Sequence, residues 1–126
     1  MLAVNGKKRS YSYLTHAISV ITTFNCMLYY TQVIFLQEGR ADVFNAFEEH
    51  VLPLLTRHNG ELLYRVRPEK TAVIATSWGY PYEIHLVSFQ TRANFESYRD
   101  DKERSQYLPL KDQSVERMLL IEGNLL

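Results

Sequence analysis

Two kinds of hydrophobic pattern divide this chain into strands and helices. Apolar residues that alternate with polar ones over a few positions predict strands, and apolar residues that recur every three or four positions predict helices. Residues 81–89 form the clearest strand, and a helix start follows it at once. Other segments rich in aromatic and β-branched residues predict strands at 29–36, 61–67 and 117–122.

The first predicted helix covers residues 41–58. Pro53 predicts a kink within it, because proline donates no backbone hydrogen bond and its ring crowds the preceding turn. Asn59 and Gly60 predict the helix end, with the glycine in the left-handed conformation. The apolar face of this helix consists of six residues, Val43, Phe44, Phe47, Val51, Leu54 and Leu55.

The second predicted helix runs from Thr91 to about residue 100, with Thr91 as its N-cap. Residues 102–107 could add a further helical turn or two before Leu108-Pro109. Residues 71–76 have strand composition but lie between turn formers, so they predict either an edge strand or an ordered loop. In the strand at 61–67, alternation places Leu63, Arg65 and Arg67 on one side and Leu62, Tyr64 and Val66 on the other.

The order strand, helix, strand, strand, helix, strand predicts an α+β, ferredoxin-like domain over residues 27–126. In this arrangement an antiparallel sheet carries its helices on one face. The strands are nevertheless largely apolar on both sides, and a bare apolar sheet face exceeds what a monomer usually exposes. We therefore expect the same face of a second copy to cover it, in a two-fold homodimer.

Residues 1–26 carry conflicting signals and are treated as an N-terminal extension. Helical spacing of apolar residues near the start gives way to β-branched residues at 20–24. A mobile or disordered arm, a helix laid on the domain and upstream sequence attached to the domain are all compatible with this pattern.

Several stretches resemble a family of unknown function in the dimeric α/β-barrel superfamily, the one catalogued as domain of unknown function thirteen-thirty. They are Met27-Leu-Tyr-Tyr-Thr-Gln-Val-Ile-Phe, the helix with Leu-Pro-Leu-Leu, Leu62-Leu-Tyr-Arg-Val-Arg-Pro, residues 81–89 and the closing Leu-Leu-Ile-Glu-Gly. The resemblance covers residues 27–126. It implies a homodimer whose two sheets face each other as a barrel, in a superfamily that includes cofactor-free monooxygenases, small-molecule isomerases, haem-handling enzymes and proteins without known activity.

Composition excludes several functional classes. Fourteen basic residues balance fourteen acidic ones, so no broad charge attracts nucleic acid or anionic lipid. No apolar run reaches the roughly 20 residues that span a bilayer. Cys26 is the only cysteine, which precludes an intramolecular disulfide and fits a reducing compartment. We expect a cytoplasmic protein that binds neither nucleic acid nor membrane.

His85 is the main chemical candidate. It lies inside the strand at 81–89, on the side shared with Glu83, Val87 and Phe89, which we expect to face the helices. A histidine there is either a hydrogen-bonded core residue or a general base in a cavity between sheet and helices.

Other residues could complete such a cavity. Tyr64, Trp78 and Tyr82 could supply aromatic walls, and Arg65 or Arg67 an anion contact. Tyr82 is an odd number of residues from His85, so the two can share a strand face only with a bulge. The structural alternatives are tyrosines in the core or interface and arginines at a solvated edge.

The remaining motifs predict neither a metal site nor a cofactor. No histidine is paired with another histidine, a cysteine or a carboxylate at the sequence spacing of a zinc site. A metal site formed by residues distant in the sequence is still compatible with the chain. Ala75-Thr-Ser-Trp-Gly79 resembles a nucleophile elbow, but a strand rather than a helix follows it, so a turn is the better interpretation. The sequence thus favours a homodimer that binds or transforms a small organic molecule, by cofactor-free oxygenation or isomerisation if it is an enzyme. The alternative is a non-catalytic protein whose main feature is the dimer.

Overall fold

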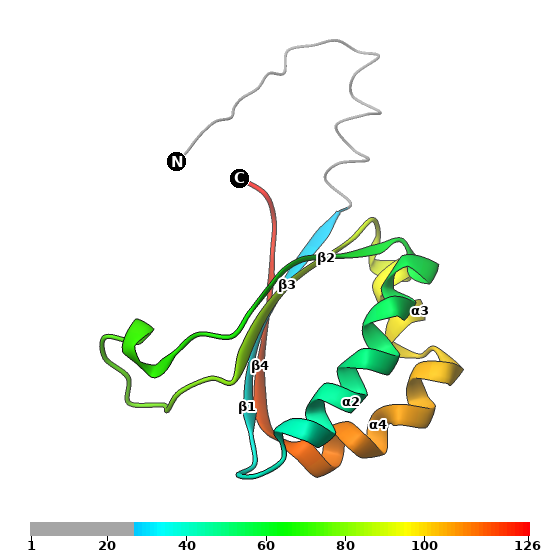
Figure 1. Cartoon of the computed structure of the whole chain (residues 1–126). Helices are drawn as coiled ribbons and strands as arrows, with labels where there is room; N and C mark the ends of the chain where they lie inside the picture. Colours follow the sequence, from blue (N-terminus) through cyan, green and yellow to red (C-terminus); the bar gives the residue numbers. More distant parts are fainter. Residues whose placement is uncertain (1–26) are drawn as a thin grey trace.

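A computed structural model describes residues 27–126, and the expectations for residues 1–26 lie outside the described part. Four strands and several helices build the domain (Figure 1). The strands are β1 (Leu28–Leu36), β2 (Gly60–Val66), β3 (Glu83–Phe89) and β4 (Val115–Gly123). The helices are α2 (Ala41–Val51), η1 (Leu52–His58), η2 (Lys70–Ala72), α3 (Arg92–Arg99) and α4 (Lys102–Ser114).

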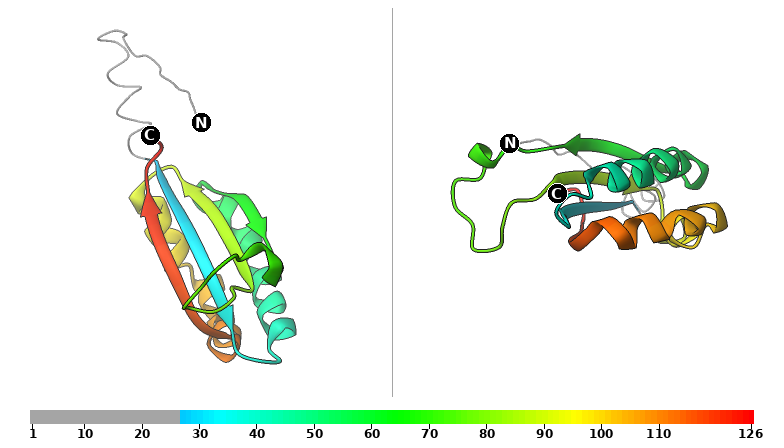
Figure 2. Two further views of the ribbon diagram at one scale, coloured as in Figure 1. Left: turned by 90° about the vertical axis from the view of Figure 1, so that its left-hand side faces the viewer. Right: turned by 60° about the horizontal axis from the view of Figure 1, so that its bottom comes forward.

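The strands form one antiparallel sheet in the order β2-β3-β1-β4. Helices α2, α3 and α4 lie together on one face of this sheet, and no helix of residues 27–126 forms a layer on the opposite face (Figures 1 and 2). This is the ferredoxin-like arrangement predicted from the sequence. We call the uncovered side of the sheet the open face and the other side the helix face.

Pro53 changes the helical geometry. The α-helical part ends at Val51, and a 3-10 helix with proline in its first turn continues to His58. Because Pro53 cannot donate to the carbonyl four residues earlier, the α-helical ladder loses a bond there. The predicted kink therefore takes the form of a switch in helix type.

The turn into β2 differs from its prediction. Asn59, not Gly60, adopts the left-handed conformation, with φ of 54°. Gly60 already belongs to β2, and a Cβ there would lie 2.7 Å from Cε1 of Phe89. Asparagine tolerates the left-handed region, whereas the crowded site beside Phe89 has no room for a side chain. Glycine is thus required at this position for space.

Helix α4 is longer than the sequence pattern indicated. Thr91 caps α3 as predicted, since its Oγ1 accepts a hydrogen bond of 3.1 Å from the Asn94 amide. The expectation that helical structure stops before Leu108-Pro109 was wrong, because α4 continues through Pro109 to Ser114. Asp101 caps its start by accepting from the amides of Glu103 and Arg104.

A bulge in β2 overturns the predicted alternation of that strand. Leu62 is opposite Val87 on β3, but the register shifts before Tyr64, which is opposite Leu86. Leu62 therefore packs into the core under the helices, while Tyr64 lies on the open face. The extra residue of a bulge exchanges the faces of everything that follows it. Arg65 is opposite His85 on β3.

Two apolar clusters fill the space between the sheet and the helices. One consists of Leu28, Tyr30, Leu54, Leu55, Val87, Phe89 and Tyr98. The other consists of Ile34, Phe44, Phe47 and Val51. On β1, Tyr30 belongs to the first cluster and Ile34 to the second, and Gln32 lies between them on the same face. The core is thus interrupted at the level of Gln32.

The connection from β2 to β3 extends over the open face (Figure 2). It holds η2 but no strand, so residues 71–76 form the ordered loop rather than the edge strand. Trp78 packs edge-on against Phe35 with ring centroids 5.3 Å apart, and the Arg117 guanidinium lies 3.9 Å from the Phe35 centroid. These contacts bury one part of the open face. Within residues 27–126, no helix is long and apolar enough to cross a membrane.

Candidate functional site

His85 lies in the gap between the two apolar clusters. It is opposite Gln32 of β1 and Arg65 of β2, and only 1% of its surface is exposed. Its side chain points to the helix face, as the sequence predicted, because it shares that face with Val87 and Phe89. A buried imidazole needs partners for both ring nitrogens.

Glu83 is the partner of one nitrogen. Its Oε1 lies 2.8 Å from Nε2 of His85 and also accepts a hydrogen bond of 2.9 Å from Nε of Arg65. Its Oε2 accepts from Arg67, through Nε at 3.1 Å and through Nη2. Because an ionised carboxylate only accepts hydrogen bonds, Nε2 of His85 must carry a proton. The two arginines thereby fix the tautomer of His85.

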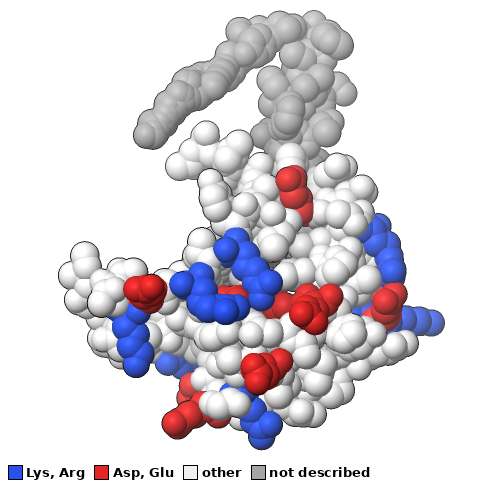
Figure 3. All heavy atoms as spheres, viewed as in Figure 1, with Lys and Arg blue, Asp and Glu red and all other residues white. Residues whose placement is uncertain are grey.

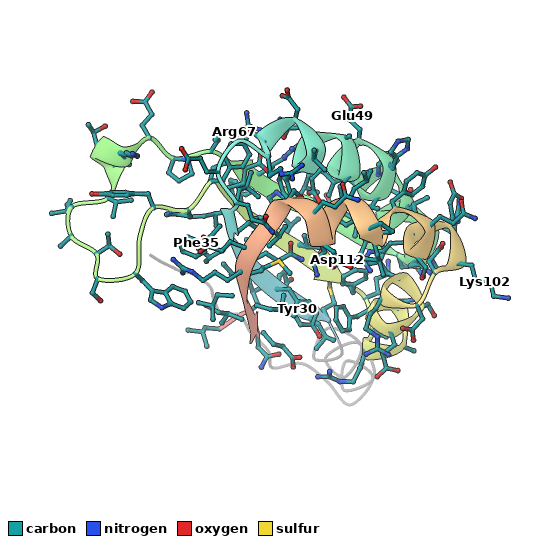
Figure 4. The ribbon with its side chains drawn as sticks, turned by 90° about the horizontal axis from the view of Figure 1, so that it is seen from below. Tyr30, Phe35, Glu49, Arg67, Lys102 and Asp112 are labelled. Atoms are coloured by element: carbon teal, nitrogen blue, oxygen red, sulfur yellow. The ribbon has the colours of Figure 1, made fainter. Side chains whose placement is uncertain are left out.

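Glu48 of α2 faces the other nitrogen. Its Oε2 is 3.5 Å from Nδ1 of His85, and it has no hydrogen-bond partner among the described residues. Glu48 is 5% exposed, whereas its neighbour Glu49 points outward from α2 (Figure 4). At 3.5 Å these two atoms are too far apart for a hydrogen bond. A buried carboxyl therefore faces an imidazole nitrogen that holds no proton.

The environments of these groups push their pKa values apart. Burial raises the pKa of Glu48 to about 7. Burial also lowers the pKa of His85, although the hydrogen bond with Glu83 opposes that effect. Burial alone would raise the pKa of Glu83, but the hydrogen bonds from Arg65, His85 and Arg67 outweigh it and keep that pKa low. At neutral pH the site therefore holds an ionised Glu83, a neutral His85 and a Glu48 close to its titration midpoint.

A cavity of about 590 Å³ lies beside this group. His85, Glu48 and Gln32 line it together with aromatic side chains that belong to the first cluster or pack against it. The ring of Tyr30, a member of this cluster, stacks on the ring of Phe95, which packs against the cluster, with centroids 4.4 Å apart. The volume falls within the range of small-molecule sites in proteins. A mostly apolar cavity with a few converging polar groups is the usual form of such a site.

Glu48, Glu83 and His85 also have ligand atoms within 4.8 Å of one another. A metal ion there would require a free oxygen of Glu83. Both of its oxygens already accept hydrogen bonds from arginines, and two guanidinium groups repel a cation. The arrangement therefore fits an ion-pair network that orients His85 better than it fits a metal centre.

The structure brings three of the other predicted site residues to the helix face. Arg65 and Arg67 bind Glu83, and the Arg67 guanidinium also lies 4.5 Å from the ring centroid of Tyr82 (Figure 4 labels Arg67). Tyr82 packs against Phe44 of α2 with centroids 5.8 Å apart. The predicted strand start at residue 81 was too early, because β3 begins only at Glu83, so strand alternation does not determine the side on which Tyr82 lies. The arginines contact Glu83 rather than open space in the cavity.

Two predicted wall residues lie elsewhere. Trp78 covers Phe35 on the open face and is 51% exposed, and Tyr64 is 67% exposed on the same side of the sheet. The structure does not bring either to the cavity beside His85. Ser77 lies in a turn in which the amides of Trp78 and Gly79 bind Oγ1 of Thr76, as expected for a turn rather than a nucleophile elbow.

Sequence reasoning missed Glu48 and the role of Glu83. Glu48 follows Phe44 by four residues and precedes Val51 by three, so it falls within the apolar stripe of its helix. A carboxylate at such a position is a signal that could have identified it. Glu83 was placed on the correct face, two residues from His85, but not recognised as its partner.

On the face shown in Figure 3, the described residues 27–126 form no large patch of a single charge. Lys and Arg side chains lie among Asp and Glu side chains over the face shown in Figure 3. This interspersion agrees with the equal numbers of acidic and basic residues. The cavity of the helix face is therefore the candidate site.

The fold and the cavity define the class of this chain as a ferredoxin-like α+β protein, and solved structures share that fold. A protein of unknown function from Rhodopseudomonas palustris is 13% identical, with a TM-score of 0.71 over 91% of this chain and 95% of that one. A DABB family protein with a ferredoxin-like fold from Mesorhizobium loti is 16% identical, with a TM-score of 0.58 over 79% and 97%.

A third similar structure is described as a dimeric ferredoxin-like protein of unknown function from Jannaschia. It is 18% identical, with a TM-score of 0.61 over 79% of this chain and 99% of that one. No family model and no curated protein matches the chain. The specific family suggested by the sequence is thus not confirmed, whereas the ferredoxin-like fold is.

Proposed function

We propose that this protein is a homodimer that binds a small organic molecule in the cavity of the helix face and transfers a proton through His85. The observation that carries this proposal is the position of His85, which is buried at the cavity wall between Glu83 and Glu48. A purely structural histidine would have both ring nitrogens hydrogen-bonded. Here Nδ1 has no hydrogen-bond partner among residues 27–126 and is available to a ligand.

The protonation states of His85, Glu83 and Glu48 suit acid–base chemistry. Glu83 holds the Nε2 proton, so Nδ1 of His85 is the free base. A proton taken from a ligand carbon or hydroxyl by Nδ1 would form an imidazolium that Glu83 stabilises. Glu48, with its pKa raised to about 7, can donate its own proton to another ligand atom, and the Nδ1 proton of the imidazolium then returns to the Glu48 carboxylate, whose Oε2 lies 3.5 Å away. The three transfers together move a proton from one ligand atom to another and restore both protein groups.

Isomerisation is the reaction that this arrangement favours among the two predicted types. It requires only a base and an acid at the same cavity, and His85 and Glu48 supply them 3.5 Å apart. Paired groups whose environments separate their pKa values are a common basis for assigning the base and the acid. Arg65 and Arg67 act as positioning residues, because they bind Glu83.

Proton exchange tests the proposal. An enolisable probe such as phenylpyruvate is incubated with protein in deuterium oxide, and loss of the exchangeable C–H signal is followed by NMR. We expect acceleration by wild-type protein and a decrease of about 10²–10⁴-fold in His85→Gln. Glutamine can still donate to Glu83, so the fold is retained. Glu49→Gln is the matched control and should keep full activity.

The alternative, a non-catalytic dimer, predicts a different result. No probe would exchange faster with protein than with buffer, and His85→Gln would alter only the free energy of unfolding. Equal exchange rates for wild type and His85→Gln would also reject His85 as the base.

The dimer is proposed from the open face. Tyr64, Val66, Leu119 and Ile121 on its strands are 67%, 46%, 39% and 48% exposed. Such an apolar surface on one side of a sheet is typical of a protein interface. Similar structures from Jannaschia and from Bacteroides fragilis are described as dimeric. We infer that two copies pack their open faces together as a barrel, and sedimentation showing a stable monomer at micromolar concentration would contradict this.

A further inference from the structure

The side of α4 that lines the cavity carries two cations. Arg104, Leu108 and Lys111 follow one another at steps of four and three residues, so they share one side of the helix, and all three line the cavity. A helix that only covered an apolar core would present apolar residues along this side. Arg104 and Lys111 are therefore unexpected there.

Neither cation is neutralised by a close carboxylate in residues 27–126. The Arg104 guanidinium lies 4.7 Å from the ring centroid of Tyr98 and donates to the backbone oxygen of Arg99, at 3.2 Å. Its Nε is buried and has no hydrogen-bond partner in the described part of the chain. The salt bridges of residues 27–126 do not include Lys111.

The other charged residues of the cavity wall leave an excess of positive charge. Arg99 and Asp100 pair with each other at 2.9 Å. The remaining groups are Arg104, Lys111 and the single carboxyl of Glu48, whose pKa both cations act to lower although burial raises it. Even with Glu48 ionised, two cations face one carboxylate. A buried arginine nitrogen without an acceptor favours a ligand that brings one.

We propose that the cavity ligand is an organic anion, whose apolar body lies among the aromatic side chains and whose carboxylate is held by Arg104 and Lys111. This inference rests on the proposed function and specifies its substrate class. The apolar body would contact Tyr30 and the other aromatic residues of the first cluster, and Phe95, which packs against that cluster. The carboxylate would enter on the α4 side, so that the atoms next to it approach Glu48 and His85. For an isomerase, the same cations would stabilise negative charge that develops on the ligand after proton removal.

Matched probes test the head group separately from the cavity. Carboxylate, amide and amine versions of the same phenyl, phenylbutyl and naphthyl bodies are titrated into the full chain at low salt, with affinity measured by NMR or calorimetry. We expect each carboxylate to bind about 10- to 100-fold more tightly than its amide, the size expected for one or two charge-assisted hydrogen bonds. The amine should bind most weakly.

Variants of α4 locate the anion site. Lys111→Gln should reduce the preference for carboxylate over amide several-fold, and the double variant with Arg104→Gln should abolish it while amide affinity stays unchanged. Lys102→Gln is the matched control, because Lys102 points outward from the same helix (Figure 4). Lys111→Gln alone keeps the test valid if loss of Arg104 impairs folding.

The outcomes separate this inference from the proposed function. If amides or amines bind as tightly as carboxylates, or if the preference survives in both α4 variants, the anion site is contradicted while the cavity stands. If the carboxylate preference is present but His85→Gln leaves proton exchange unchanged, the anion site stands and the proton-transfer function does not. If no probe binds the wild-type protein, both are contradicted.

Discussion

The two faces of the sheet distribute polar and apolar residues in opposite ways. The helix face buries three ionisable residues, Glu48, Glu83 and His85, between its apolar clusters. The open face leaves apolar side chains such as Tyr64 and Ile121 in contact with solvent. An isolated domain usually does the reverse, because buried charge and exposed apolar surface both cost free energy.

The comparison indicates a separate role for each face. Burial of an ionisable group costs free energy unless the group is paired. Both oxygens of Glu83 are paired, whereas Oε2 of Glu48 has no hydrogen-bond partner among residues 27–126. Glu48 lies at the cavity, so we infer that its unfavourable burial serves the function of the cavity. The exposed apolar residues lie together on the opposite side, and we assign them to contact with a second copy. A substitution on one face should therefore impair the role of that face and leave the role of the other face intact.

The largest effect is expected from removal of Glu83. Glu83→Ala leaves His85, Arg65 and Arg67 without their acceptor in and beside the core. Removing one partner of a buried charge network typically costs about 3–5 kcal/mol. Urea unfolding measures the loss, and Glu61→Ala, at an exposed position of β2, should change the free energy of unfolding by less than about 0.5 kcal/mol. A cost for Glu83→Ala as small as this control would contradict the network.

A charge on the open face should break the dimer and spare the domain. Ile121 is 48% exposed and opposite Thr31. Ile121→Glu should weaken association by about 2–4 kcal/mol, roughly 30- to 1000-fold in the dissociation constant. Sedimentation velocity measures the change, with Leu125→Glu beyond β4 as the control. Unchanged association in Ile121→Glu would remove the open face as the interface.

Glu48→Gln should change how stability depends on pH. The folded pKa of Glu48, about 7, lies above the ordinary value of 4.5, so the native state binds the extra proton more tightly than the unfolded chain. The wild type therefore loses stability as pH rises from about 4.5 to 7, by about 1–3 kcal/mol. Glutamine does not titrate, so Glu48→Gln should be more stable than wild type above pH 7 and lack this loss.

Chemical unfolding at several pH values measures the effect. Glu49→Gln is the matched control, because its side chain is exposed one residue away. If the free energy of unfolding depends on pH in the same way in Glu48→Gln and wild type, burial of the Glu48 carboxyl does not destabilise the folded protein.

The smallest effect is expected at Trp78. Its ring covers Phe35 on the open face, next to the proposed interface. Trp78→Ala should cost about 0.5–1.5 kcal/mol, the usual range for an aromatic pair beyond its buried area. Tyr80→Ala, in the same loop and 49% exposed, provides the control for thermal unfolding. A loss of proton exchange in Trp78→Ala would contradict the separation of the two faces.

The sequence predicted the fold well because hydrophobic periodicity determines it. The strand at 81–89 and the cap at Thr91 were both found from local pattern alone. The course of α4 through Pro109 and the bulge before Tyr64 were not, because tertiary packing overrides local preference there. A bulge leaves no periodic signal, so the faces of Leu62 and Tyr64 could not be assigned.

The candidate site was predictable only in part. His85 was identified because a histidine within an apolar strand is unusual. Glu48 lies 37 positions earlier on another element, and its approach to His85 depends on how α2 crosses the sheet. Trp78 was expected at the cavity on composition, but its loop extends over the open face. Contacts between distant elements require the assembled fold.

The protonation of His85 tests the central claim most directly. Nitrogen NMR of the imidazole in the full chain distinguishes the two neutral tautomers from the charged form. At pH 7 we predict a neutral ring with the proton on Nε2 and a bare Nδ1, and a changed Nδ1 signal in Glu48→Gln but not in Glu49→Gln. A charged ring at pH 7, or a proton on Nδ1, would contradict the assignment of His85 as the base of the cavity.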